Sequence, residues 1–93
     1  MKDGQLEQIE FLVASVLGEH RRQMAKWGVQ DRTSFEWMTY LTEEVGELAE
    51  AISEYEYRGA EVADIWAEAI QVATLALKIA EMALGEPSRK VWQ

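Results

Sequence analysis

The sequence contains no cysteine, one histidine and one proline among its 93 residues. Without cysteine the chain has no disulfide, no thiolate metal site and no cysteine nucleophile. The lone histidine, His20, excludes a histidine-rich zinc site and disfavours a Ser-His-Asp triad. A di-iron carboxylate bundle requires Glu-x-x-His pairs, and no glutamate here has a histidine three residues later. The scarcity of proline, together with abundant alanine, leucine and glutamate, favours helices over strands.

Basic residues are also few, at nine against 17 acidic residues, so the net charge is −8. This charge disfavours binding to nucleic-acid phosphates or to an anionic membrane surface. The first ten residues are too polar for a signal peptide, and the most apolar window, residues 65–84, carries too many polar side chains to span a membrane. We therefore expect a cytoplasmic protein without a nucleic-acid or membrane partner.

Hydrophobic periodicity predicts three helices, at about residues 3–27, 33–58 and 60–84. Thr33 and Glu36 form a capping-box pattern at the start of the second helix, and Gly59 is a typical residue for its end. Gly85 and Pro87 stop the third helix. The pattern predicts one all-α domain over residues 1–93, whose last residues, Ser88 to Gln93, form a tail that is frayed or held by Trp92.

The third predicted helix is apolar on two sides. One seam includes Ile65 and Val72, and the other includes Trp66 and Ile70. A helix that is apolar on two sides must be buried on two sides, and a chain of this length buries only about 60–65% of its unfolded surface. We therefore expect a three-helix protomer that completes a four-helix-type bundle as a homo-oligomer, either a dimer or a tetramer.

Carboxylates form two clusters. The first consists of Glu43, Glu44 and Glu47, and the second of Glu61, Asp64 and Glu68. Glu44 and Glu47 are expected to lie about as far before the turn at Arg58-Gly59 as Glu61 and Asp64 lie after it, allowing for the helix ends. The antiparallel helices can therefore bring the two acidic faces opposite each other. Facing carboxylates suit Mg²⁺ or Mn²⁺, which could clamp a triphosphate and activate a water for attack on phosphorus. The alternative is a solvated glutamate-rich helix face. Gly46, in mid-helix between these acids, predicts that another group approaches closely there.

The segment Glu43 to Ala51, EEVGELAEA, followed by EVAD from Glu61 to Asp64, resembles the EExxE…ExxD signature of MazG-like nucleotide pyrophosphohydrolases, over roughly residues 5–84. The resemblance implies an all-α enzyme that uses Mg²⁺ to cleave nucleoside triphosphates to monophosphate and pyrophosphate in nucleotide-pool house-cleaning. It implies metal ligands at Glu44, Glu47, Glu61 and Asp64. It also implies a catalytic set of Glu43, Glu44 and Glu47, in which Glu43 orients the attacking water.

The same resemblance extends to two further segments. Some short phage-type members have a Glu and a Gln at the positions of Glu68 and Gln71. Glu68 is therefore a further candidate ligand, with a salt-bridging helix glutamate as the alternative. Residues 20–30 also resemble the family, in which a Trp and neighbouring polar groups line the base pocket. This implies substrate-binding roles for Gln23 and Trp27, and packing at the end of the bundle is the alternative for Trp27.

Longer family members continue past the third helix with a basic segment that helps to hold phosphates. Here only a short tail, Ser88 to Gln93, follows Pro87. Lys78, the tail or a neighbouring subunit are the candidates for this role, which makes Lys78 a third candidate substrate-binding residue. The alternative to an enzyme is a non-catalytic helical oligomeric interaction protein that retains the bundle.

Overall fold

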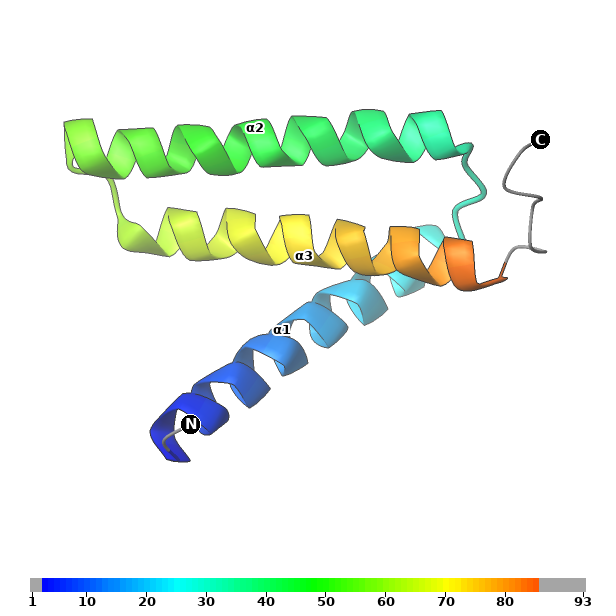
Figure 1. Ribbon diagram of the computed structural model, residues 1–93, viewed down its shortest axis with the longest axis horizontal. Coiled ribbons are helices and arrows are strands. Elements are labelled where there is room, and N and C mark those ends of the chain that lie inside the picture. The colour runs from blue at the N-terminus through cyan, green and yellow to red at the C-terminus, as the bar shows by residue number, and fades with distance from the viewer. Residues whose placement is uncertain (1–2, 86–93) are drawn as a thin grey trace, which may run out of the picture.

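The computed structural model of the chain describes residues 3–85. It consists of the helices α1 (Asp3–Trp27), α2 (Ser34–Arg58) and α3 (Val62–Gly85), as Figure 1 shows. These residues contain no strand, so the predicted all-α fold is confirmed. None of the helices in this range meets the length and hydropathy required of a membrane span. The predicted contact of Trp92 lies outside the described residues.

The bounds of α2 follow from its capping residues. The Thr33 side chain accepts a hydrogen bond of 3.1 Å from the Glu36 backbone N–H, and the Glu36 carboxylate accepts one of 2.9 Å from the Thr33 N–H. This reciprocal pair satisfies two backbone donors that a helix start leaves free. At the other end Gly59 has φ 69°, a left-handed conformation that glycine adopts without strain. The chain can therefore reverse direction between α2 and α3.

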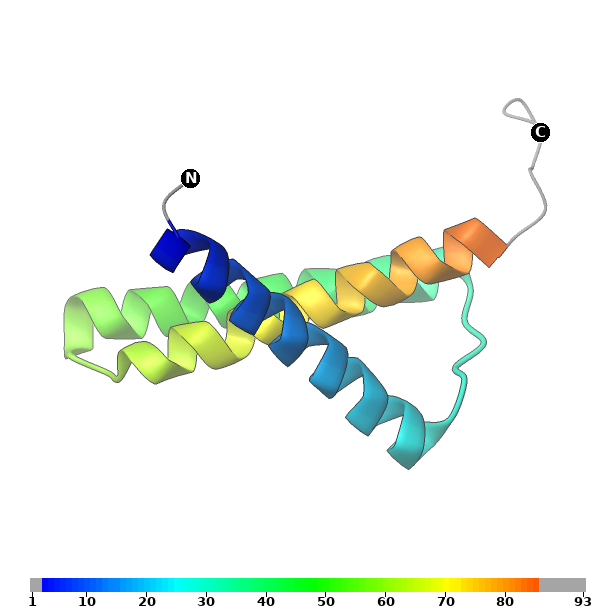
Figure 2. The ribbon, with the colours of Figure 1, turned by 90° about the horizontal axis from the view of Figure 1, so that it is seen from below.

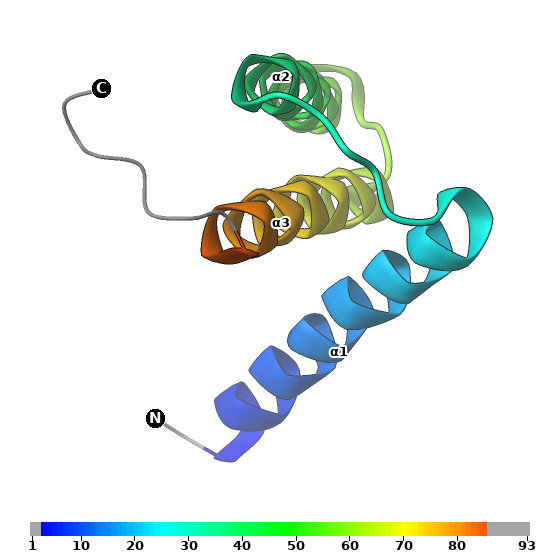
Figure 3. The ribbon, with the colours of Figure 1, turned by 90° about the vertical axis from the view of Figure 1, so that its right-hand side faces the viewer.

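α3 is the central helix of the protomer. It contacts both α1 and α2, whereas the backbones of α1 and α2 do not contact each other in the described part of the chain. Figure 3 shows α3 between the other two helices. α2 runs antiparallel beside it (Figure 1), and α1 crosses it obliquely (Figure 2). Helices of the same chain thus contact α3 on two sides. They do not bury both of its apolar seams, because Trp66 of the second seam is 45% exposed. A second subunit therefore stays the predicted cover for this seam.

The protomer buries few of its apolar side chains. Trp37, which is 4% exposed, is the one buried hydrophobic residue between residues 4 and 85. Of the apolar residues of α2, Leu41 and Leu48 are half-buried. Met38, Val45 and Ile52 are 43% to 56% exposed and recur every seven residues, so they form an apolar stripe along α2. The amino-terminal half of α1 is similarly exposed. Phe11 stacks on Trp66 of α3 with 6.5 Å between ring centres, yet it is 63% exposed. Both helices therefore leave apolar surface in water.

The prediction for Gly46 is wrong within the protomer. A Cβ atom built at this position would have no heavy atom within 4 Å, apart from its immediate neighbours and its own helix backbone. Gly46 is exposed on α2. No group of the described chain therefore approaches the helix closely at Gly46.

We expect the protein to be a homo-oligomer in solution. With one buried hydrophobic residue among residues 4–85, the protomer leaves the apolar stripe of α2 and the start of α1 in water. Light scattering at micromolar concentration should give the mass of a dimer or a tetramer. A monomeric mass combined with the full helical signal in circular dichroism would contradict this prediction.

Candidate metal centre and adjoining cleft

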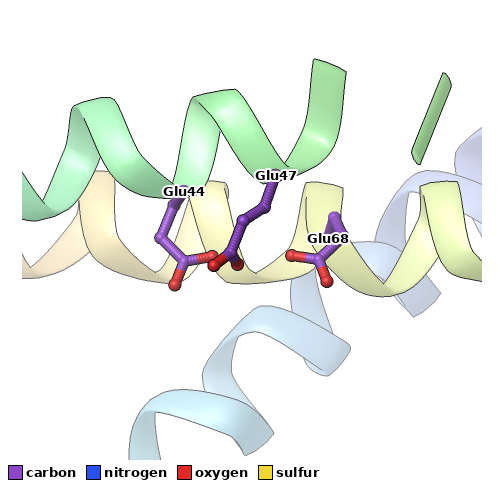
Figure 4. Close-up of side chains that lie close together, drawn as sticks. All are labelled: Glu44, Glu47 and Glu68. Carbon is purple, nitrogen blue, oxygen red and sulfur yellow. The ribbon is translucent and has the colours of Figure 1, made fainter. Parts of the chain in front are cut away.

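Three carboxylates converge between α2 and α3 (Figure 4). Glu44 and Glu47 lie one turn apart on α2, and Glu68 projects from α3. One carboxylate oxygen from each residue lies within 4.8 Å of those of the other two. The fold therefore brings two members of the first predicted cluster together with one member of the second. We call Glu44, Glu47 and Glu68 the carboxylate cluster.

The carboxylate cluster is electrostatically unfavourable without a cation. Burial raises the pKa of the Glu44 carboxyl, and the negative charges of Glu47 and Glu68 raise it further. Burial also raises the pKa of Glu68, with further contributions from Glu47 and Asp64. In addition, the buried Oε2 atom of Glu44 has no hydrogen-bond partner in the described structure. Ionising these groups at neutral pH thus costs free energy.

This donor set fits a hard divalent cation. All three ligands are carboxylate oxygens, which Mg²⁺ and Mn²⁺ prefer over nitrogen or sulfur. Two ligands of one Mg²⁺ lie at most about 4.2 Å apart, twice the usual bond length of about 2.1 Å. The three carboxylate oxygens now lie no more than 4.8 Å apart, so small side-chain movements would bring all three within bonding distance of one ion. Coordination would also give the orphaned oxygen of Glu44 a partner.

Glu61 and Asp64 lie nearer the turn than the carboxylate cluster does. Glu61 is exposed just before α3, and its carbonyl accepts a 3.1 Å hydrogen bond from the Asp64 N–H. Glu61 lies two helical turns before Glu68, which corresponds to about 10 Å along a helix axis. In an antiparallel pair, residues equally far from the turn face each other, and Glu44 and Glu47 lie about three to four turns from it. The prediction of comparable distances is therefore wrong, which explains why Glu68 reaches Glu44 and Glu47.

Two predicted residues lie at the margin of the carboxylate cluster. Asp64, in the first turn of α3, is close enough for its charge to raise the pKa of Glu68. Glu43 is exposed on α2 beside Glu44 and contributes to the raised pKa of Glu44. Both side chains can therefore act on a ligand held at the cluster without belonging to it.

A cleft of about 250 Å³ adjoins the carboxylate cluster, because Glu44 forms part of its wall. The predicted substrate-binding residues Gln23, Trp27 and Lys78 line the same cleft. A larger cavity of about 540 Å³ shares Lys78 with it but touches none of the three clustered carboxylates. The smaller cavity is therefore the candidate substrate cleft, and we refer to it as the Glu44 cleft.

A chain of hydrogen bonds connects α1 to α3 at the Glu44 cleft. The buried ammonium of Lys78 donates to the side-chain oxygen of Gln23, and the Gln23 amide donates to Gln71 at 3.2 Å. Burial lowers the pKa of Lys78, and the opposing effect of the Glu19 carboxylate is smaller. Because an ammonium has three donors, Lys78 can bind an anion in the cleft while it stays bonded to Gln23.

Arg32 and Tyr40 are among the residues of the cleft that were not predicted from the sequence. Arg32 lies in the loop between α1 and α2, and its Nη1 atom donates to the Tyr40 hydroxyl at 3.0 Å. A single arginine in a loop belongs to no periodic pattern. The one local signal was its position directly before the capping residue Thr33.

Comparison with family models places the chain among known proteins. The model of the MazG nucleotide pyrophosphohydrolase domain matches residues 32–92, which is more than half of the chain. The protein belongs to this family. The resemblance in the acidic signature is thereby confirmed, and the matched range includes all three residues of the carboxylate cluster. Comparisons with curated proteins and with solved structures gave no significant match.

Without divalent cations, the carboxylate cluster is expected to make the MazG domain less stable as the pH rises. Because the folded-state pKa values of Glu44 and Glu68 are raised, the folded protein holds more protons than the unfolded one just above the usual Glu pKa of about 4.3. This contribution to the free energy of unfolding therefore falls as the pH rises through that window. Glu44→Gln should be at least as stable as the wild type at pH 7, and this advantage should disappear near pH 4 in urea unfolding.

Mg²⁺ should reverse the same penalty, because it binds the folded state preferentially. At pH 7 it is expected to raise the melting temperature of the wild type more than that of Glu44→Gln. NaCl at matched ionic strength screens charge without coordinating and is the control. Equal stabilisation by MgCl₂ and NaCl would mean that the carboxylate cluster is only a solvated acidic surface.

Proposed function

We propose that this MazG-family protein is a Mg²⁺-dependent nucleoside triphosphate pyrophosphohydrolase that cleaves (d)NTP to (d)NMP and pyrophosphate, with Mn²⁺ as a substitute ion. The observation that carries the proposal is the position of Glu44, which belongs both to the carboxylate cluster and to the wall of the cleft. A cation at the cluster and a nucleotide in the cleft would meet at this residue. Family membership supports the reaction class.

Glu44, Glu47 and Glu68 are the proposed principal ligands, and Asp64, one turn before Glu68, is the next candidate. Glu61 is a further proposed ligand, supported by its position in the family signature, and binding would require its side chain to reach toward the cluster. When bound, Mg²⁺ supplies positive charge that polarises a phosphoryl oxygen and stabilises the charge that develops on the phosphates. The carboxylates thus allow a chain of net charge −8 to bind an anionic substrate.

Glu43 is the proposed orienting residue for the attacking water. Its exposed carboxylate lies beside Glu44 on α2, where it can accept a hydrogen bond from a water molecule and take up its proton. The water oxygen would attack the α-phosphorus, and the bond from that phosphorus to the bridging oxygen would break. Pyrophosphate would then leave with that oxygen.

The Glu44 cleft is the proposed nucleotide site. Trp27 is half exposed at the end of α1, and stacking of a base on its indole would contribute about 1–3 kcal/mol. Gln23 and Lys78 provide polar contacts in the same cleft. The proposed role is house-cleaning of nucleotide pools in the cytoplasm. The net charge of −8 supports the proposal of no nucleic-acid or membrane partner, and the exposed apolar surface supports the proposed homo-oligomer.

Glu44→Gln is expected to lower pyrophosphate release from nucleoside triphosphates by at least ~10²-fold, the scale on which loss of a preorganised charge contact acts in catalysis. The substitution keeps the volume of the side chain and removes one negative charge, so the helices and the assembly should persist. Circular dichroism and light scattering check this, while a coupled pyrophosphate assay over all dNTPs with Mg²⁺ gives the rate.

Glu56→Gln is the matched control, since Glu56 is an exposed glutamate of the same helix outside the signature. Glu50 is less suitable because its charge acts on Glu68. Equal rates for Glu44→Gln and Glu56→Gln would contradict the assigned site. The exposed apolar surface of α1 and α2 favours the alternative of a non-catalytic interaction protein, and wild-type protein that releases no pyrophosphate from any dNTP would support that alternative.

A further inference from the structure

The Glu44 cleft contains positive charges that the protein itself does not pair. Arg22 is paired with Glu19, whose carboxylate oxygen lies 2.6 Å from its Nε atom. Lys78 and Arg32 line the same cleft, and neither has a carboxylate within ion-pair distance among residues 3–85. What distinguishes Lys78 and Arg32 is that both line the same cleft. Their charges repel each other, since Arg32 lowers the pKa of Lys78, so an anionic ligand in the cleft that they share would be stabilised.

Arg32 is held in place by aromatic side chains. Its Nη1 atom donates to the Tyr40 hydroxyl at 3.0 Å, and its guanidinium carbon lies 4.6 Å from the centre of the Tyr40 ring. The same carbon lies 5.9 Å from the centre of the buried Trp37 ring. A guanidinium has five N–H donors in a rigid plane. The contact with Tyr40 uses one donor, so the others can serve a ligand.

The acidic residue nearest to Arg32 along α2 is already engaged. Glu36 is close enough for Arg32 to lower its pKa, but its carboxylate accepts the Thr33 N–H in the capping box, and the Thr33 hydroxyl accepts the Glu36 N–H. Turning this carboxylate toward Arg32 would break the capping-box hydrogen bond that the Thr33 N–H donates to it. The helix start therefore keeps Glu36 from neutralising Arg32.

We infer that Arg32, positioned by Tyr40, binds the phosphate chain of the nucleotide together with Lys78. The planar guanidinium matches two phosphate oxygens at once, and the ammonium of Lys78 adds a second charge in the same cleft. The inference rests on the proposed function and assigns to Arg32 a phosphate-binding role that the sequence analysis offered to Lys78, the tail or a neighbouring subunit. It makes Arg32 a substrate-binding residue and Tyr40 a positioning residue.

Calorimetric titration of the full-length protein with tripolyphosphate, in the presence of MgCl₂, tests this inference without turnover of a nucleotide. Arg32→Gln is expected to weaken binding by at least about tenfold, the loss typical of one charge-assisted hydrogen bond. Arg21→Gln removes the same charge from an exposed position of α1 outside the cleft and is the control. Equal dissociation constants for the two variants would overturn the inference.

Two further variants keep the test decisive if Arg32→Gln unfolds. Tyr40→Phe removes only the hydroxyl that orients Arg32, so this variant should bind tripolyphosphate more weakly than the wild type. If the double variant Tyr40→Phe/Arg32→Gln folds, it should bind tripolyphosphate as well as Arg32→Gln alone does. Arg32→Lys keeps the charge but loses the planar donor pair, so its binding should also weaken. Wild-type affinity in both Tyr40→Phe and Arg32→Lys would overturn the inference.

The assay of pyrophosphate release separates this inference from the proposed function. Loss of phosphate binding at Arg32 should raise the KM for the nucleotide more than it lowers kcat. If the wild type hydrolyses a nucleotide and Arg32→Gln has the same KM for it, only the role of Arg32 is overturned. Binding of tripolyphosphate through Arg32 without hydrolysis of any nucleotide would overturn only the proposed function.

Discussion

Mutual repulsion among Glu44, Glu47 and Glu68 is the constraint on which the rest of the site depends. The antiparallel packing of α2 against α3 holds their oxygens within 4.8 Å, and that packing requires the tight turn at Gly59. A protomer with one buried hydrophobic residue in its described part has little apolar burial to offset such a cost. The carboxylate cluster therefore lowers the stability of the fold, and a bound cation would restore that stability. Functional sites commonly reduce stability in this way.

The three helices supply different parts of the site. The match to the MazG domain begins at residue 32, so it covers the helices of the carboxylate cluster and Arg32, but not α1. α1 nevertheless supplies Gln23 and Trp27 to the Glu44 cleft, and Gln23 bonds both Lys78 and Gln71 on α3. In our account α2 and α3 hold the metal, and α1 closes the cleft in which the nucleotide binds.

Local chemistry was sufficient to predict the helices. The capping box at Thr33 and the left-handed Gly59 act over a few residues, so their effect is visible in the sequence. The face shared by Glu44 and Glu47 follows in the same way from the period of one helix. Within the described residues, all three helices and the all-α class were predictable at this level.

The pairing between helices was not predictable in detail, because it depends on how far each residue lies from the turn and on how the helices cross. The sequence pattern predicted Glu61 and Asp64 opposite Glu44, whereas the fold brings Glu68 there. The burial of Lys78 has a similar cause, since α1 crosses α3 at an angle that no local pattern encodes. The role of Arg32 in the cleft was not predicted, because loop residues show no hydrophobic periodicity.

The central claim is that the carboxylate cluster binds the divalent cation. Anomalous scattering from crystals grown with Mn²⁺ and a non-hydrolysable triphosphate tests it most directly. The account predicts a manganese peak bonded to oxygens of Glu44, Glu47 and Glu68, with a phosphate oxygen completing the coordination. A manganese peak elsewhere in the protein, with none at Glu44, would contradict it.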